Sequence, residues 1–162
     1  GWHPAPPPSG RGQGIALGID AGTFVGLAVE VAVDRSTGDV RVIRMVCAQD
    51  MGLAINPEGA TIQMEGCLTM GLGYALAEEV RFEGGKVLDT NFDTYEIPRF
   101  SWLPEIDTVI LDAVDDPPQG GGEPAIIVVG AAVANAIHDA VGARVLRMPM
   151  TPERVTAAMA KG

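Results

Sequence analysis

The chain has 162 residues, enough for one domain with a buried core, and its apolar (47%) and charged (20%) fractions are typical of a folded globular protein. The formal net charge is −10 and no run of Lys and Arg occurs, which argues against a nucleic-acid-binding face and against attraction to an anionic membrane. Cys47 and Cys67 form no CxxC motif and neither histidine lies near them in sequence. We therefore expect two buried free thiols and no metal ligands from this chain.

The first third of the chain predicts an arm followed by a hairpin. Residues 1–13 are rich in Pro and Gly and predict an extended arm or linker ahead of a domain that spans 14–162. The segment 14–33 is made of small and β-branched residues, and the alternation in 27–33 predicts a strand. A Ser-Thr-Gly-Asp turn leads to a second strand at 40–48, so the two should pair.

A long helix is predicted next, from Asn56 to about Glu79. Asn56 can accept hydrogen bonds as the N-cap, and Pro57 suits the first helical position because it lacks an N–H. Three glycines recur every seven residues and so share one face of this helix: Gly59, Gly66 and Gly73.

Each such glycine costs about 1 kcal/mol relative to alanine inside a helix, which indicates that some group packs closely against this face. Gln63 lies on the same face, between Gly59 and Gly66. A side-chain amide in that position needs a hydrogen-bonding partner, either a neighbouring backbone group or a ligand.

The rest of the chain mixes strands and helices. Extended segments are expected at 80–87 (with a turn at Gly84–Gly85), at 91–98 (which can pair with it), at 105–114 and at 144–148. Helices are expected at 124–141, which contains the most apolar stretch but is too short for a membrane span, and from Pro152 onwards, capped by Thr151. Because the strands and helices do not alternate regularly, the predicted fold class is α+β, with two long helices and a short C-terminal one.

The loop before the second long helix is the most informative segment for chemistry. It reads Gln119-Gly-Gly-Gly-Glu-Pro124, so three glycines precede the carboxylate of Glu123, which should lie near the helix N-cap. A carboxylate in a tight loop is what a general base requires. The same residues are also compatible with a plain turn followed by a helix-capping acid. A phosphate-binding loop is disfavoured, because no GK[ST] follows and the acid would repel phosphate.

Several motifs, in this order, resemble the molybdenum-binding large subunit of the xanthine oxidase family, in its isoquinoline 1-oxidoreductase or aldehyde dehydrogenase branch. They are Asp50-Met-Gly with Asn56-Pro57, Gln63-Met-Glu-Gly66 with Gly71-Leu-Gly73, Tyr95-Glu-Ile-Pro98, Gly122-Glu-Pro124, Ala134-Asn-Ala-Ile137 and Met148-Pro-Met-Thr151. The resemblance covers nearly the whole chain and implies a C-terminal part of that subunit, within a molybdopterin-binding domain.

The resemblance also implies site residues. Glu123 matches the glutamate base that activates the Mo–OH group, and Gln63, Gly121 and Gly122 are expected to contact the cofactor. The implied reaction is hydroxylation of an aldehyde or N-heteroaromatic C–H carbon with oxygen derived from water. The chain would not be active alone.

The implied cofactor is a molybdenum pyranopterin in its cytosine dinucleotide form, bound mostly by segments outside this chain. The implied partners are the remainder of the molybdenum subunit and a small subunit with two iron–sulfur clusters. No nucleic acid is expected to bind. The compartment, cytoplasmic or periplasmic, is left open.

Two features depart from the family pattern and two alternatives stay open. Gly-Gly-Gly precedes Glu123 where relatives often have a bulkier residue, and Gly66-Cys67 stands where many have Gly-Gly. A non-catalytic structural domain would keep Glu123 paired and buried. A small-ligand binding module would hold a closed pocket on its glycine-rich face.

Overall fold

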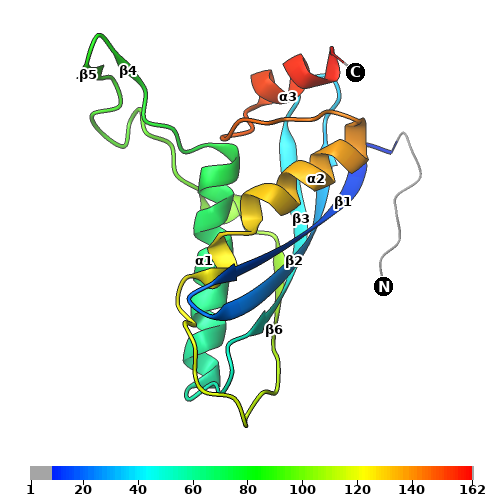
Figure 1. Ribbon diagram of the computed structural model, residues 1–162. Helices are drawn as coiled ribbons and strands as arrows, with labels where there is room; N and C mark the ends of the chain where they lie inside the picture. Colours follow the sequence, from blue (N-terminus) through cyan, green and yellow to red (C-terminus); the bar gives the residue numbers. More distant parts are fainter. Residues whose placement is uncertain (1–8, 162) are drawn as a thin grey trace.

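The computed structural model describes residues 9–161, and its main sheet has four strands (Figure 1). Three of them, β1 (Arg11–Asp20), β2 (Thr23–Val33) and β3 (Val40–Asp50), follow one another as antiparallel neighbours. The fourth, β6 (Glu105–Ile110), pairs in parallel with β3 and gives the order β1-β2-β3-β6. The predicted hairpin is present, with strands longer than expected.

The first strand was not predicted from the sequence, because glycines occupy positions of β1 that face the core. Gly12 and Gly14 face helix α2 (Val129–Val141), and the α2 backbone at Ala136 and Ala132 occupies the places where their β-carbons would stand. The helix can approach the sheet this closely only because these positions lack side chains. The last residues of the expected arm, Arg11–Gln13, thus belong to β1, whereas its first eight lie outside the described residues.

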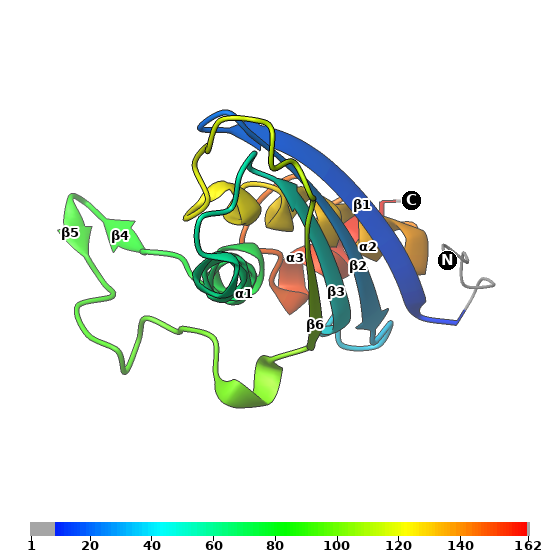
Figure 2. The same ribbon diagram turned by 90° about the horizontal axis from the view of Figure 1, so that it is seen from below.

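The core lies between one face of the sheet and the helices α1 (Pro57–Leu76) and α2. Figure 2 shows the curved sheet with α1 on its concave side, and α2 packs against β1 and β2. The largest fully buried side chains come from all these elements and include Leu27, Met45, Met64, Leu68, Val133 and Ile137. The other face carries exposed apolar residues, among them Leu17 and Phe24. This arrangement is the α+β class predicted from the sequence.

Helix α1 begins as predicted and ends early. The Asn56 side chain accepts a hydrogen bond from the N–H of Gly59 at 3.0 Å, and Pro57 occupies the first turn. The helix stops at Leu76 instead of Glu79. The carbonyl of Gly73 accepts from two successive backbone N–H groups beyond the helix, which closes the last turn.

The predicted helix 124–141 is two helices. A short 3₁₀ helix, η2 (Pro124–Ile126), comes first, and α2 starts only at Val129. It ends as expected at Gly142, whose φ of 78° suits glycine. By length and composition alone, Pro124–Val141 could cross a membrane, but half of that window is buried inside the fold, as in a core helix.

A long excursion, residues 80–104, leaves the body between α1 and β6 (Figure 2). Its hairpin has two-residue strands, β4 (Phe82–Glu83) and β5 (Lys86–Val87), on either side of the predicted glycine turn. The expected pairing of 91–98 is wrong, because that segment forms no strand. A 3₁₀ turn, η1 (Phe100–Trp102), precedes β6.

Two other extended segments are shorter than predicted. Strand β6 ends at Ile110, four residues before the expected end, and residues 144–148 form no strand. The last helix, α3 (Pro152–Met159), starts as expected, since the Thr151 side chain accepts from the N–H of Arg154 at 3.5 Å.

Candidate active site

The glycine-rich loop Gly120–Glu123 lies where β2 begins, β3 ends and α1 passes. Its three glycine carbonyls accept, in chain order, from Thr23 Oγ1 at 2.6 Å, Gln49 Nε2 at 3.5 Å and Cys67 Sγ at 3.1 Å. Each of these side chains is buried. Buried side chains of the core therefore donate a hydrogen bond to every carbonyl of the Gly-Gly-Gly segment.

This arrangement also fixes where the amide groups point. The C=O and N–H of a trans peptide point in opposite directions, so three inward carbonyls turn the following N–H groups outward. These are the N–H groups of Gly121, Gly122 and Glu123, and none has a hydrogen-bond partner among the described residues. Such a row of N–H groups suits an anionic or oxygen-bearing ligand.

Glu123 itself is exposed and forms no ion pair with any described residue. It occupies the N-cap position of η2, but its side chain makes no capping hydrogen bond. Burial raises the pKa of the Cys67 thiol, and the nearby Glu123 carboxylate raises that pKa further. The expected support from a long helix dipole is weaker than predicted, because three-residue η2 separates Glu123 from α2.

The structure places the side chain of Gln63 close to Gly122. The Gln63 Nε2 atom lies 3.5 Å from the place where a β-carbon would stand on Gly122. The Gln63 side chain is exposed, and it makes no hydrogen bond within the part of the chain that the structure describes. Its amide is thus free to donate to a ligand beside the loop.

The glycine face of α1 is more open than the heptad spacing indicated. A β-carbon on Gly66 would meet no described atom within 4 Å, and one on Gly59 would meet only the capping Asn56. The third glycine of this face, Gly73, is closely packed, because a β-carbon there would collide with the side chains of Glu78 and Pro98. Off this face, the Val129 side chain of α2 fills the space beside Gly71. The face beside Gln63 therefore remains accessible.

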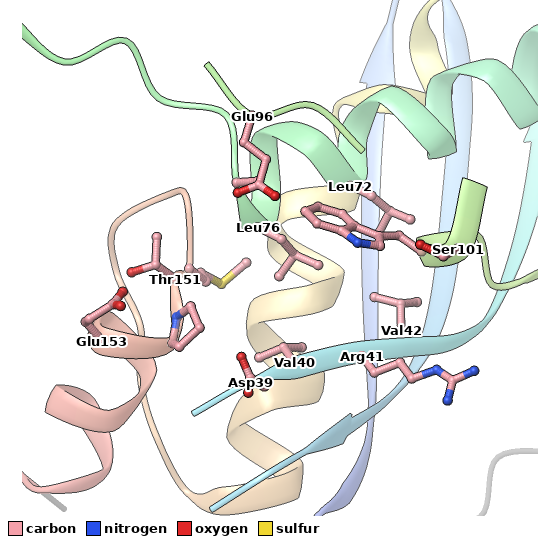
Figure 3. A pocket seen from close by; sticks show the side chains of 14 residues that line it. Asp39, Val40, Arg41, Val42, Leu72, Leu76, Glu96, Ser101, Thr151 and Glu153 are labelled. Carbon is pink, nitrogen blue, oxygen red and sulfur yellow. The ribbon is translucent and has the colours of Figure 1, made fainter. Parts of the chain in front are cut away.

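A cavity of about 540 Å³ lies elsewhere, between β3, the end of α1, η1 and the start of α3 (Figure 3). Its apolar walls include Val42, Leu72, Trp102 and Met150. None of the residues that line it belongs to the glycine-rich loop, and Gln63 is not among them. The cavity is distinct from the candidate site. Among residues 9–161, no group of three or more His, Cys, Asp and Glu side chains could hold a metal ion.

Sequence reasoning missed the three donors beneath the loop. Thr23 and Gln49 occupy inward positions of strands in which inward and outward residues alternate. The other inward residues of these strands are apolar, so a polar residue at an inward position is a signal that could have identified both. Cys67 was expected to be a buried thiol and is one, but its contact with Gly122 is not visible in the sequence.

Comparison with known proteins identifies the family. The pattern of the molybdopterin cofactor-binding domain family matches residues 11–104, more than half of the chain. The chain is 43% identical over 130 residues to one of the subunits of nicotinate dehydrogenase from Pseudomonas putida, which is 80% of this chain and 11% of that relative. It is 32% identical over 145 residues to the beta subunit of isoquinoline 1-oxidoreductase from Brevundimonas diminuta, which is 87% of this chain and 18% of that relative.

The fold comparison agrees. The crystal structure of quinoline 2-oxidoreductase from Pseudomonas putida 86 matches with a TM-score of 0.79 and 31% identity, over 86% of this chain and 19% of that one. The chain belongs to the molybdopterin cofactor-binding domain family, and it is similar to a segment of the molybdenum-binding subunits of the xanthine oxidase family, as its motifs predicted. It spans only about a tenth to a fifth of the length of these relatives.

Proposed function

We propose that this chain supplies the catalytic base and part of the cofactor-binding shell of a molybdenum hydroxylase that oxidises an aldehyde or N-heteroaromatic C–H carbon. The observation that carries the proposal is the exposed Glu123 carboxylate, which lies beside three outward N–H groups and the amide of Gln63. None of these groups has a partner among residues 9–161. Relatives whose names include isoquinoline 1-oxidoreductase and aldehyde oxidoreductase support the substrate class.

The residues present fit a pyranopterin. The cofactor is rich in oxygen and nitrogen acceptors, and the N–H groups of Gly121 and Gly122, together with Gln63, are donors without protein partners in the described chain. The open space at Gly66 leaves room for a flat ring against α1. In this proposal the cofactor has the cytosine dinucleotide form and is held mostly by other segments of the subunit.

A molybdenum pyranopterin, when bound, would supply the two-electron redox chemistry of a hydroxylation whose oxygen comes from water. The role of this chain is to move a proton. A Glu123 oxygen accepts the proton of the attacking oxygen nucleophile, and the fixed loop keeps that carboxylate pointed at it. The side-chain amide of Gln63 and the loop N–H groups donate to the cofactor and orient it. A separate small subunit with two iron–sulfur clusters would carry the electrons away.

The proposal is tested by Glu123→Gln in the assembled enzyme that contains this chain. Removing a general base should lower kcat by a factor on the order of 10² to 10⁴. Molybdenum per protein, measured by elemental analysis, should stay near the wild-type value, because Glu123 is not proposed to hold the metal. Glu83→Gln, on the exposed tip hairpin, is the matched control and should behave as wild type.

Two results would contradict the proposal. One is unchanged turnover in Glu123→Gln. The other is a fully assembled preparation that contains no molybdenum, which would favour the non-catalytic structural domain.

A further inference from the structure

Three buried polar side chains from three different elements converge on three consecutive carbonyls. Thr23 starts β2, Gln49 is the penultimate residue of β3 and Cys67 lies in the middle of α1. Their exposed fractions are 0%, 0% and 3%. The loop they hold has no side chains of its own to pack, because all three of its residues before Glu123 are glycines.

Buried polar groups are unfavourable unless they form hydrogen bonds, so their presence needs a reason. The only hydrogen bond of the Gln49 side chain in the described chain goes to the carbonyl of Gly121, and its Oε1 atom has no partner there. Within the described residues, the Thr23 hydroxyl likewise donates only to the carbonyl of Gly120. The neighbouring inward-facing positions of both strands are apolar, so we attribute the polar side chains of Thr23 and Gln49 to their hydrogen bonds with the loop.

The loop needs its glycines as much as its donors. A β-carbon on Gly120 would stand 2.5 Å from the Ala21 side chain, and one on Gly121 would stand 3.1 Å from the sulfur of Met51. Glycines admit the close approach but leave the backbone free to move, so an external restraint must define its conformation.

We propose that Thr23, Gln49 and Cys67 act as positioning residues that fix the direction of Glu123 by holding the three carbonyls before it. This inference rests on the proposed function of Glu123. The three residues touch neither substrate nor cofactor, and they act through the loop. Their loss should therefore weaken catalysis more than substrate binding.

The test compares Thr23→Val, which removes the hydroxyl, with Thr23→Ser, which keeps it, in the assembled enzyme. A misplaced base costs on the order of 10- to 100-fold in rate, so we expect a kcat loss of that size in Thr23→Val, with KM changed by less than about twofold. Thr23→Ser should restore most of kcat.

A second readout does not depend on turnover. Because Gly122 covers the Cys67 thiol, release of the loop should speed alkylation of Cys67 by iodoacetamide at least about tenfold in Thr23→Val, measured by peptide mass mapping. Cys47 is the internal control, since it is fully buried in the core and makes no contact with the loop among the described hydrogen bonds. Its alkylation rate should not change.

Wild-type kcat and wild-type Cys67 labelling in Thr23→Val would overturn the proposal, and so would equal losses in Thr23→Val and Thr23→Ser. If both thiols of Thr23→Val react rapidly, the variant is unfolding, and the pair Cys67→Ala and Cys67→Ser then decides. Lower kcat in Cys67→Ala with rescue in Cys67→Ser supports the restraint, whereas equal kcat in the two contradicts it.

The two proposals fail separately. If Glu123→Gln keeps full turnover while Thr23→Val exposes Cys67 alone, the restraint on the loop stands and the assignment of the base is wrong. If Glu123→Gln loses turnover while Thr23→Val changes nothing, the base stands and the positioning role is wrong.

Discussion

At the scale of single residues, two glycines of this chain have opposite surroundings. A β-carbon on Gly14 would collide with backbone atoms of Ala132 and Ala136 in α2, which cannot move away as a flexible side chain can. A β-carbon on Gly66 would meet nothing within 4 Å among the described residues. The same substitution should therefore have opposite effects at the two positions.

We expect Gly14→Ala to lower the free energy of unfolding by about 1–3 kcal/mol, because α2 must shift away from the sheet. Gly66→Ala should raise it by up to about 1 kcal/mol, because alanine is the better helix former and the site has room. Urea unfolding of both variants measures the difference. Equal effects at the two sites would show that the approach of α2 to β1 is looser than the structure describes.

At the scale of elements, the short helix α3 is attached through one acid, Glu79, to the segment that follows α1. Arg154 donates to Glu79 at 2.8 and 2.9 Å, and Arg147 donates to the same carboxylate at 2.7 Å. These hydrogen bonds lower the pKa of Glu79 below its usual 4.5, and the bond from Arg154 has the larger effect. An acid whose pKa is lowered in the folded state contributes stability above its unfolded pKa, and that contribution is lost as the pH falls through the folded value.

Replacing Glu79 by Gln should therefore reduce stability at pH 7, and the gap between wild type and variant should narrow as the pH falls below the unfolded value of 4.5 and through the lowered pKa of the folded state. The free energy of unfolding in urea at pH 7, 5 and 3.5 checks this. Glu65→Gln is the control, because Glu65 lies on an exposed part of α1 and forms no ion pair with the described residues. A gap that is independent of pH would indicate that α3 is held by packing alone.

At the scale of the whole molecule, β3 is one of the two inner strands of the sheet. It pairs with β2 on one side and with β6 on the other, and Cys47 sits at its centre without any exposed surface. Burial raises the pKa of the Cys47 thiol to about 11. A group whose pKa is raised on folding contributes its stability below the unfolded pKa, here 9.0, and loses it as the pH rises through the folded value.

Wild type should thus lose about 1 kcal/mol of stability relative to Cys47→Ala between pH 8 and pH 10, after the constant cost of the smaller side chain is subtracted. Chemical unfolding at the two pH values measures the change. Parallel pH profiles for the two proteins would show that the thiol ionises as easily in the folded state as in the unfolded one.

Local rules explain how much of this fold the sequence could predict. Asn56, Pro57 and Thr151 mark helix starts through contacts within one turn, and the alternation in β2 and β3 reports a sheet with one covered face. Strand β1 was not predicted, because its inward positions hold glycines rather than alternating apolar side chains. The reason for these glycines is visible only in the structure, where α2 packs against them.

The candidate site likewise has a part that the sequence could predict and a part that it could not. Glu123 and Gln63 were predicted as site residues from their motifs, and the structure brings the Gln63 amide beside the loop. The support beneath that loop joins Thr23 to Gly120 and Gln49 to Gly121, across 97 and 72 residues of sequence. No local sequence pattern encodes contacts between residues so far apart, so these hydrogen bonds could be identified only from the three-dimensional structure.

The excursion of residues 80–104 has a practical consequence. At its tip, Gly84 and Gly85 have no described atom within 4 Å of an added β-carbon, while the base of the hairpin is tied by Arg81 and Asp89. A backbone cut at the tip would leave the two fragments associated, since β6 of the second fragment would still pair with β3 of the first. The tip is therefore the place to splice in a fluorescent reporter or an affinity handle, because nothing that holds Glu123 passes through it.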